Sequence, residues 1–177
     1  MKLFIGIDIS EKTQKIINSK LEFLHRKYPD FDWVPSENYH VTIQHFGETD
    51  KAKEVEQRLK DLLYDQNSFY LHSRGLSLFM REKITIYLDF HRQKILEGLE
   101  RKISADFFAS NQNYKYIPHI TLAKYRIPSK QQYLLIKKKV EQTSIEEEIE
   151  VKKTTLFESI TQGSKSFYNK IAQIPLL

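Results

Sequence analysis

Short apolar runs rich in β-branched and aromatic residues alternate along the chain with longer segments of helical periodicity. KLFIGID, residues 2–8, is typical of a buried strand. KITIYLDF, residues 83–90, alternates apolar and polar positions, as a strand with one covered face does. Further strands or strand-like runs are predicted over 31–38 (a short strand and turn), 39–46, 68–80, 114–125, 147–159 and 166–177, the last two joined through Gly163.

Four segments have the spacing of amphipathic helices. They cover residues 10–27, 51–65, 92–108 and 130–142. Ser10 and Asp50 are the predicted caps of the first two, and Ser129 with Gln132 forms a capping box for the fourth. The inward-facing positions are predicted to be Ile16, Ile17, Leu21 and Leu24; Val55, Leu59, Leu62 and Leu63; and Ile95, Leu96, Leu99, Ile103 and Phe107.

The order of these elements favours an α+β fold. Strands and helices are interspersed, and several strand pairs are joined closely enough to be antiparallel, with helices on one face of each sheet. No linker or low-complexity stretch divides the chain, so we expect residues 1–177 to form one domain with two similar lobes.

Composition narrows the function without naming it. The chain has no cysteine, which excludes disulfides, thiolate nucleophiles and Cys-based zinc sites, and suits a cytoplasmic protein. No apolar run is long enough for a membrane span, and the N-terminus does not have the form of a signal peptide. The net charge of +5 mildly favours an anionic partner such as RNA, although a Lys- and Glu-rich surface explains it more simply.

One tetrapeptide pattern occurs twice. His40-Val-Thr42-Ile and His119-Ile-Thr121-Leu each hold a histidine and a threonine two positions apart, in segments predicted to be strands. Residues i and i+2 of a strand share a face, so each copy presents an imidazole beside a hydroxyl. The pair could be two buried strands with a common pattern, or two halves of one active site.

Two imidazoles in one cleft suit phosphodiester chemistry. One accepts a proton from the attacking hydroxyl while the other donates one to the leaving oxygen. Threonine hydroxyls can hold the non-bridging oxygens, and the scheme needs no metal. His45 lies five residues after His40, so strand parity predicts that it faces away and serves packing. His25, His72 and His91 have no such context.

The motifs and their flanks resemble a known family, the two-histidine (2H) phosphoesterases. Within it, the chain is most similar to the RNA 2′,3′-cyclic phosphodiesterases, also called 2′-5′ RNA ligases. The resemblance covers nearly the whole chain. It is carried by LFIGIDI, WVPSENYHVTIQHFGE, PHITLAKYR and LFESITQGSKSFYNKIAQIPL, in that order.

This resemblance implies a bilobal α+β fold with pseudo-twofold symmetry, in which two antiparallel sheets form a central cleft with helices on the outer faces. It also implies hydrolysis of RNA 2′,3′-cyclic phosphate ends to 2′-phosphates, without metal or other cofactor. By position, His40 is the proton donor and His119 the proton acceptor, with Thr42 and Thr121 on the phosphate. The motifs are nearly symmetric, so the residues themselves leave the two histidine roles open.

The chain differs from the family pattern at one basic position near the second motif, and the resemblance also indicates its partners. Where the family often has arginine this chain has Lys124, although Arg126 follows, and we expect both to contact phosphate or RNA. Base stacking could involve Trp33, Phe46, Tyr116 and Tyr125. We expect RNA ends or cyclic nucleotides as partners, no membrane, no obligate protein partner, and a monomer. The alternatives are reversible 2′-5′ ligation of RNA halves, and a non-catalytic RNA- or nucleotide-binding module.

Overall fold

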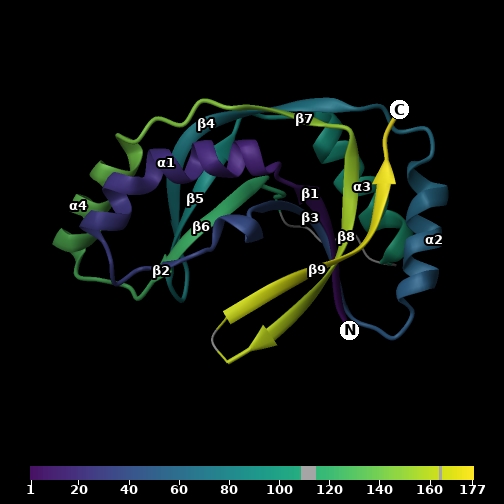
Figure 1. Ribbon diagram of the computed structural model, residues 1–177, viewed down its shortest axis with the longest axis horizontal. Coiled ribbons are helices and arrows are strands. Elements are labelled where there is room, and N and C mark those ends of the chain that lie inside the picture. The colour runs from purple at the N-terminus through teal and green to yellow at the C-terminus, as the bar shows by residue number, and fades with distance from the viewer. Residues whose placement is uncertain (109–114, 164) are drawn as a thin grey trace.

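The computed structural model describes residues 1–108, 115–163 and 165–177, and it has the expected α+β architecture (Figure 1). The helices are α1 (Glu11–Lys27), η1 (Ser36–Asn38, a 3-10 turn), α2 (Ala52–Leu63), α3 (Lys94–Phe107) and α4 (Lys130–Glu141). The strands are β1 (Lys2–Asp8), β2 (Asp32–Trp33), β3 (His40–Glu48), β4 (Phe69–Met80), β5 (Ile84–Phe90), β6 (His119–Tyr125), β7 (Glu148–Val151), β8 (Lys153–Gln162) and β9 (Lys165–Pro175).

The strands form two antiparallel halves that meet at the centre. The order is β7-β4-β5-β6-β3-β1-β8-β9, with β2 paired to the end of β6 at Ala123 and Lys124. At the junction, β3 and β6 share one pair, Val41 with Ile120. The two strands that carry the repeated tetrapeptide are therefore central neighbours. The expected α+β fold is confirmed, but the strands form one continuous antiparallel sheet rather than two, because this pair joins its halves.

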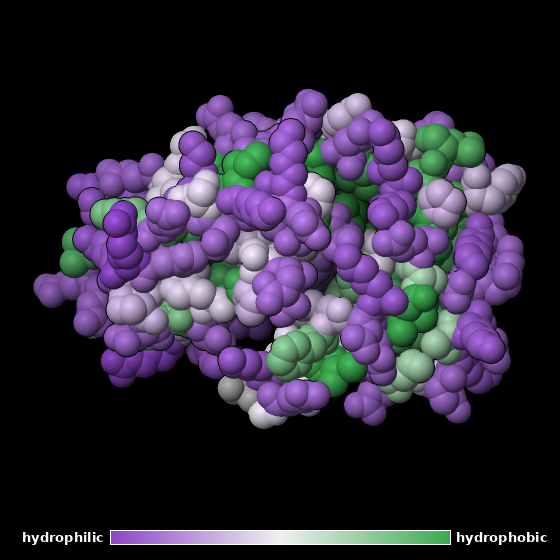
Figure 2. Space-filling view, in the orientation of Figure 1, coloured by the Kyte–Doolittle hydropathy of each residue, from purple (hydrophilic) through white to green (hydrophobic). Residues whose placement is uncertain are grey.

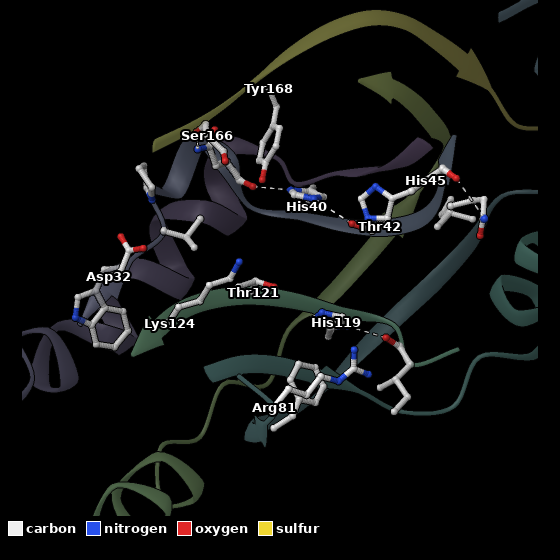
Figure 3. Close-up of a pocket in the computed structure, with 18 of the residues that line it drawn as sticks. Asp32, His40, Thr42, His45, Arg81, His119, Thr121, Lys124, Ser166 and Tyr168 are labelled. Atoms are coloured by element: carbon white, nitrogen blue, oxygen red, sulfur yellow. Dashed lines mark hydrogen bonds between the residues drawn. The ribbon is translucent and has the colours of Figure 1, made fainter. Parts of the chain in front are cut away.

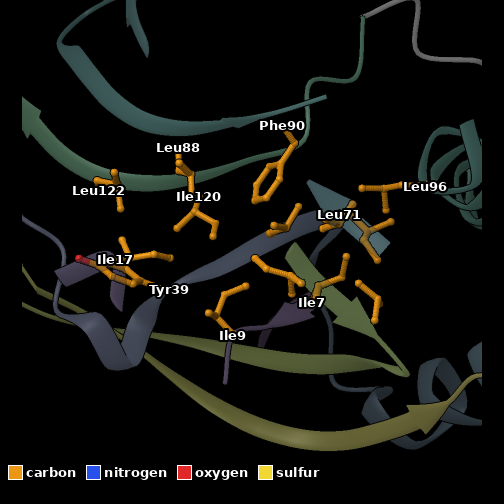
Figure 4. Close-up of a cluster of buried hydrophobic side chains, with 14 of the residues drawn as sticks. Ile7, Ile9, Ile17, Tyr39, Leu71, Leu88, Phe90, Leu96, Ile120 and Leu122 are labelled. Carbon is orange, nitrogen blue, oxygen red and sulfur yellow. The ribbon is translucent and has the colours of Figure 1, made fainter. Parts of the chain in front are cut away.

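Helices cover each half separately. Figure 1 shows α1 and α4 together over one half, and α2 and α3 together beside the other. Apolar side chains from both halves, among them Ile7, Leu88 and Ile120, form one buried cluster (Figure 4). This continuous core fixes the two central strands relative to each other.

Several helix predictions are corrected in detail. Ser10 and the Ser129–Gln132 box cap their helices as predicted. Asp50 does not cap α2: the helix starts after Lys51, which makes no side-chain cap bond. Ile95, predicted to face inward, is exposed, because the buried stripe of α3 passes through Leu96 and Leu99 instead.

Two strand predictions were also too long. The run 147–159 is two strands that break at Lys152, because β7 pairs with β4 in one half and β8 pairs with β1 in the other. The run 114–125 becomes a strand only at His119; residues 115–118 have no regular structure, and Tyr114 lies outside the described residues.

The surface gives no sign of an apolar interface on the face seen in Figure 2, where hydrophilic side chains separate small hydrophobic areas. Among the described residues, no helix is both long and apolar enough to cross a membrane.

Candidate active site

A cleft of about 930 Å³ lies over the junction of β3 and β6. Its wall includes both histidines and both threonines of the repeated motif, His40, Thr42, His119 and Thr121 (Figure 3). The single Val41–Ile120 pair explains why both motifs reach one space, because it sets the two histidine-bearing strand starts side by side in antiparallel directions. The structure thus brings together the residues that the sequence analysis selected.

The two imidazoles are anchored in the same way. The Nδ1 of His40 lies 2.7 Å from the carbonyl of Asn38, and the Nδ1 of His119 lies 2.7 Å from the carbonyl of Ile117. A carbonyl only accepts, so each Nδ1 carries the hydrogen. Nε2 is therefore the nitrogen available for proton exchange in both rings.

Thr42 interacts directly with the first of these nitrogens. Its hydroxyl lies 3.1 Å from Nε2 of His40, which confirms that the two side chains share one face of β3. With Nδ1 protonated, the hydroxyl donates to the unprotonated Nε2 of the neutral ring. Tyr116 also contacts this strand, because its hydroxyl donates to the carbonyl of Thr42 at 2.8 Å.

Aromatic rings surround each histidine. The ring of His40 lies 4.9 Å from that of Phe4 and 4.8 Å from that of Tyr168, between centroids. The ring of His119 lies 5.2 Å from that of Phe79 and 5.4 Å from that of Tyr87, both edge-on. These contacts hold each imidazole in one orientation and remove water from one side of it.

A carboxylate stands opposite each histidine on the neighbouring strand. Asp8 of β1 is the register partner of His40, and Asp89 of β5 is the register partner of His119. Each is itself paired with a cation, Lys170 for Asp8 and Arg74 for Asp89. The site thus has approximate twofold symmetry in its anchors as well as in its motif.

Burial lowers the pKa of both histidines. For His40 the loss of solvation outweighs the hydrogen bond to Asn38, and the neighbouring His45 and His119 lower its pKa further. For His119 burial again dominates, the bond to Ile117 opposes it, and Arg81 adds to the lowering. Each imidazole therefore stays neutral at pH values at which an exposed histidine would already take up a proton.

The prediction that His45 faces away from the cleft is wrong. In the β1–β3 register Ile5 pairs with Gln44 and Gly6 with Thr42, so Ile43 is an extra residue in β3. Such a bulge reverses the alternation of side chains, and His45 therefore returns to the face of His40 and Thr42. It lines the cleft, and its ring lies 5.5 Å from that of Phe4 (Figure 3).

The second motif has the same bulge at the equivalent place. Ile86 pairs with Ala123 and Tyr87 with Thr121, which leaves Leu122 extra in β6. Lys124, five residues after His119, therefore lies on the cleft face as His45 does, five residues after His40. The repeat is longer than the tetrapeptide, since each copy ends in a basic side chain on the cleft.

Comparison with known proteins decides the family. Residues 19–161 match the sequence profile of the 2′-5′ RNA ligase superfamily. The chain belongs to this superfamily. Among curated relatives, an RNA 2′,3′-cyclic phosphodiesterase of Thermotoga maritima is 27% identical over 134 residues, covering 71% of each chain. One of the same name from Methanothermobacter thermautotrophicus is 21% identical, covering 72% of this chain and 73% of its own.

Solved structures of other proteins show the same fold. The crystal structure of TT0787 of Thermus thermophilus superposes with a TM-score of 0.75 at 17% identity, covering 99% of this chain and 98% of that one. Escherichia coli LigT complexed with 3′-AMP superposes with a TM-score of 0.72 at 20% identity, covering 99% and 97%. The superfamily and the named relatives together indicate that this protein is a phosphoesterase, which is a kind of hydrolase.

The other residues proposed for RNA contact divide into two groups. Trp33, Tyr116 and Lys124 line the cleft. Phe46 and Tyr125 are outside its lining: Phe46 packs on Phe107 of α3, and Tyr125 stacks on Phe31. Arg126 is not brought to the cleft wall either, because its guanidinium lies over the ring of Tyr125.

Sequence reasoning missed several cleft residues that come from hairpin ends. Arg81 enters from the β4–β5 turn, and Lys165, Ser166 and Tyr168 enter from β9. Asn38 ties the β8–β9 hairpin to the site by donating from its side chain to the carbonyl of Ser166 at 2.9 Å. Within the described part of the chain, no group of three or more His, Cys, Asp or Glu side chains is placed to hold a metal ion.

Proposed function

We propose that the protein hydrolyses RNA 2′,3′-cyclic phosphate ends to 2′-phosphates, with one histidine from each half as acid and base. The observation that carries the proposal is the matched pair of imidazoles, each with Nδ1 held by a backbone carbonyl and Nε2 left for the cleft. This arrangement suits proton transfer on both sides of a phosphorus centre, with one imidazole as base and the other as acid. Supporting it, two relatives bear the name RNA 2′,3′-cyclic phosphodiesterase.

The proposed step runs as one displacement. Nε2 of His119 takes a proton from water, and the water oxygen bonds to phosphorus. The bond from phosphorus to O3′ breaks with its electron pair, and His40, which enters the step as the imidazolium protonated on both nitrogens, gives its Nε2 proton to O3′. The products are a 2′-phosphate and a free 3′-hydroxyl. The two rings end with exchanged protonation states and return to the starting state through solvent.

The threonines and Lys124 are proposed to bind the phosphate. Thr42 and Thr121 each stand two residues beyond a histidine on the cleft wall, where a hydroxyl can donate to a non-bridging oxygen. The ammonium of Lys124 also lines the cleft and adds charge complementary to the phosphate. Because each half supplies one histidine and one threonine, we propose that residues 1–177 act as one bilobal catalytic unit. We also propose that the protein is a monomer and acts in the cytoplasm.

A direct assay tests the proposal. Adenosine 2′,3′-cyclic phosphate and a cyclic-phosphate-ended RNA are incubated with the protein in the presence of EDTA, and the products are separated by chromatography. We expect the 2′-phosphate alone. Loss of activity with EDTA would contradict metal-free chemistry, and formation of the 3′-phosphate would contradict cleavage of the bond to O3′. Binding of the RNA without conversion would favour a non-catalytic module.

The same geometry admits 2′-5′ ligation as a second candidate. If the 5′-hydroxyl of another RNA replaces water as the nucleophile, the same breakage at O3′ leaves a 2′-5′ phosphodiester. The superfamily name and the size of the cleft, about 930 Å³, favour testing it. Incubation of a cyclic-ended RNA with a 5′-hydroxyl RNA distinguishes the two reactions by product length.

A further inference from the structure

The two ends of the cleft differ in charge. Beyond Val41 and Ile120, β3 and β6 run in opposite directions, so His45 and Lys124 lie toward opposite ends of the site (Figure 3). We call these the His45 end and the Lys124 end. The central motif residues lie between them.

The His45 end gathers cations. Arg81 is close enough to His119 to lower its pKa, and in Figure 3 its guanidinium extends toward that ring. Lys115 lines the cleft next to Tyr116, whose bond to the carbonyl of Thr42 fixes this segment beside β3. The lining carries no carboxylate on this side, and no carboxylate of the described residues forms an ion pair with Arg81.

The Lys124 end is of mixed character. Asp32 of β2 is the register partner of Lys124, and both line the cleft, as does Lys165. Trp33, Val34 and Pro35 continue the wall with apolar surface. The indole of Trp33 is held rigid, because its N–H donates to the carbonyl of Tyr28 at 2.9 Å. This end suits a nucleoside base better than a second phosphate.

From this asymmetry we propose that the His45 end binds the phosphate preceding the terminal nucleotide, so that the enzyme prefers oligonucleotide ends to mononucleotides. The inference rests on the proposed function, which puts the cyclic phosphate between His40 and His119. In an RNA end, the ribose that bears the cyclic phosphate continues through its 5′ oxygen to the next phosphate. With the terminal base at the Lys124 end, that phosphate lies toward Arg81, Lys115 and His45.

His45 gives this end a distinct hydrogen-bonding group. Its ring stands at the position equivalent to Lys124 and is exposed to the cleft. Phenylalanine at this position would keep the ring contact with Phe4 but lose both nitrogens. His45 is therefore a specificity residue in this scheme, and Arg81 supplies the permanent charge.

Substrates that differ in one phosphate test the inference. We compare kcat/KM for adenosine 2′,3′-cyclic phosphate, for the dinucleotide adenylyl-adenosine 2′,3′-cyclic phosphate, and for that dinucleotide with a neutral methylphosphonate linkage. The wild-type protein should prefer the charged dinucleotide at least tenfold over the other two. Its logarithmic salt slope should be steeper by about 0.7, the value for one phosphate contact on a single strand.

Variants then locate the contact. Arg81→Met and His45→Phe should each reduce the ratio of dinucleotide to mononucleotide kcat/KM at least fivefold, with no effect on the methylphosphonate ratio. Lys20→Met removes one exposed charge outside the cleft lining and should leave the ratio unchanged. Circular dichroism and thermal melting of each variant separate a lost contact from lost folding.

The outcomes distinguish this inference from the proposed function. If wild-type protein hydrolyses the mononucleotide but shows no preference, or if both variants retain it, the His45 end does not bind the phosphate and the proposed function stands. If Lys124→Met abolishes the preference while Arg81→Met does not, the phosphate lies at the other end. If no cyclic phosphate is hydrolysed, the proposed function itself fails.

Discussion

Replacing either cleft histidine by asparagine removes the reactive nitrogen while keeping its anchor. The amide nitrogen of asparagine occupies the place of Nδ1, so it can still donate to the carbonyl of Asn38 in the His40→Asn protein, or of Ile117 in the His119→Asn protein. Nothing remains at the position of Nε2. The substitution therefore isolates proton transfer from the support that the ring gives to the strand.

The expected magnitude follows from the chemistry of that nitrogen. A positioned acid or base typically supplies about 10²–10⁴-fold, so each variant should lose that factor in kcat on adenosine 2′,3′-cyclic phosphate. Because the two rings act on the same displacement, the kcat of the double variant should be little lower than that of the less active single variant. Retention of kcat within tenfold of wild type by either single variant would refute the two-histidine mechanism.

A modified substrate separates donor from acceptor. With sulfur in place of the 3′ oxygen of the cyclic phosphate, the leaving group departs as a thiolate and needs no proton from the enzyme. His40→Asn should then recover most of its lost rate, and His119→Asn should not. The reverse pattern would exchange the two roles and leave the remainder of the mechanism intact.

Three other predictions concern acidity, phosphate binding and packing. Since burial lowers the pKa of both His40 and His119, the pH optimum of kcat/KM should lie below 6.5, with a decline toward pH 8; a flat profile to pH 9 would contradict it. Thr42→Val keeps the shape but removes the hydroxyl, and should lower kcat/KM about 10- to 100-fold, while Thr42→Ser stays within a few-fold of wild type. Gly6→Ala places a methyl 2.7 Å from a backbone oxygen of β3 and should reduce the free energy of unfolding by about 1–3 kcal/mol, measured by thermal melting. The control Gly98→Ala, in α3 with no atom within 4 Å of the new methyl, should not destabilise.

The alternation of side chains along a strand predicted part of the site correctly and failed where β3 contains a bulge. It placed His40 beside Thr42 correctly, because no bulge separates them. It failed for His45, because the extra residue Ile43 reverses the alternation, and no glycine or proline in the motif marks that bulge. The matching bulge at Leu122 could not be predicted for the same reason.

Contacts between segments that are distant in the sequence could not be predicted from local patterns. The helix spacing gave all four α-helices to within a few residues, since each buries an apolar stripe against its own half. The division of the run 147–159 between two halves depends on pairing with β4 and β1, which no local pattern encodes. Arg81 reaches the cleft only because the β4–β5 hairpin is packed beside β6.

Arg81 acts on one of the two histidines. Each ring has an anchoring carbonyl and an opposing aspartate, but Arg81 lowers the pKa of His119, whereas His45 and His119 lower the pKa of His40. Asp89 acts in the opposite sense on the same ring and is itself paired with Arg74. A cation beside His119 favours its neutral form, which is the form that a base requires.

The substrate with sulfur in place of the 3′ oxygen also tests the effect of Arg81 on His119. Because that substrate needs no acid, its kcat/KM should follow a single limb that rises with pH through the pKa of the base. Arg81→Met removes a positive charge near His119 and should move this limb to higher pH, whereas Lys20→Met should not move it. If His40 were the base, the limb would stay in place in the Arg81→Met protein, since Arg81 does not contribute to the pKa of His40. The displacement of one limb thus assigns the proton acceptor independently of the asparagine variants.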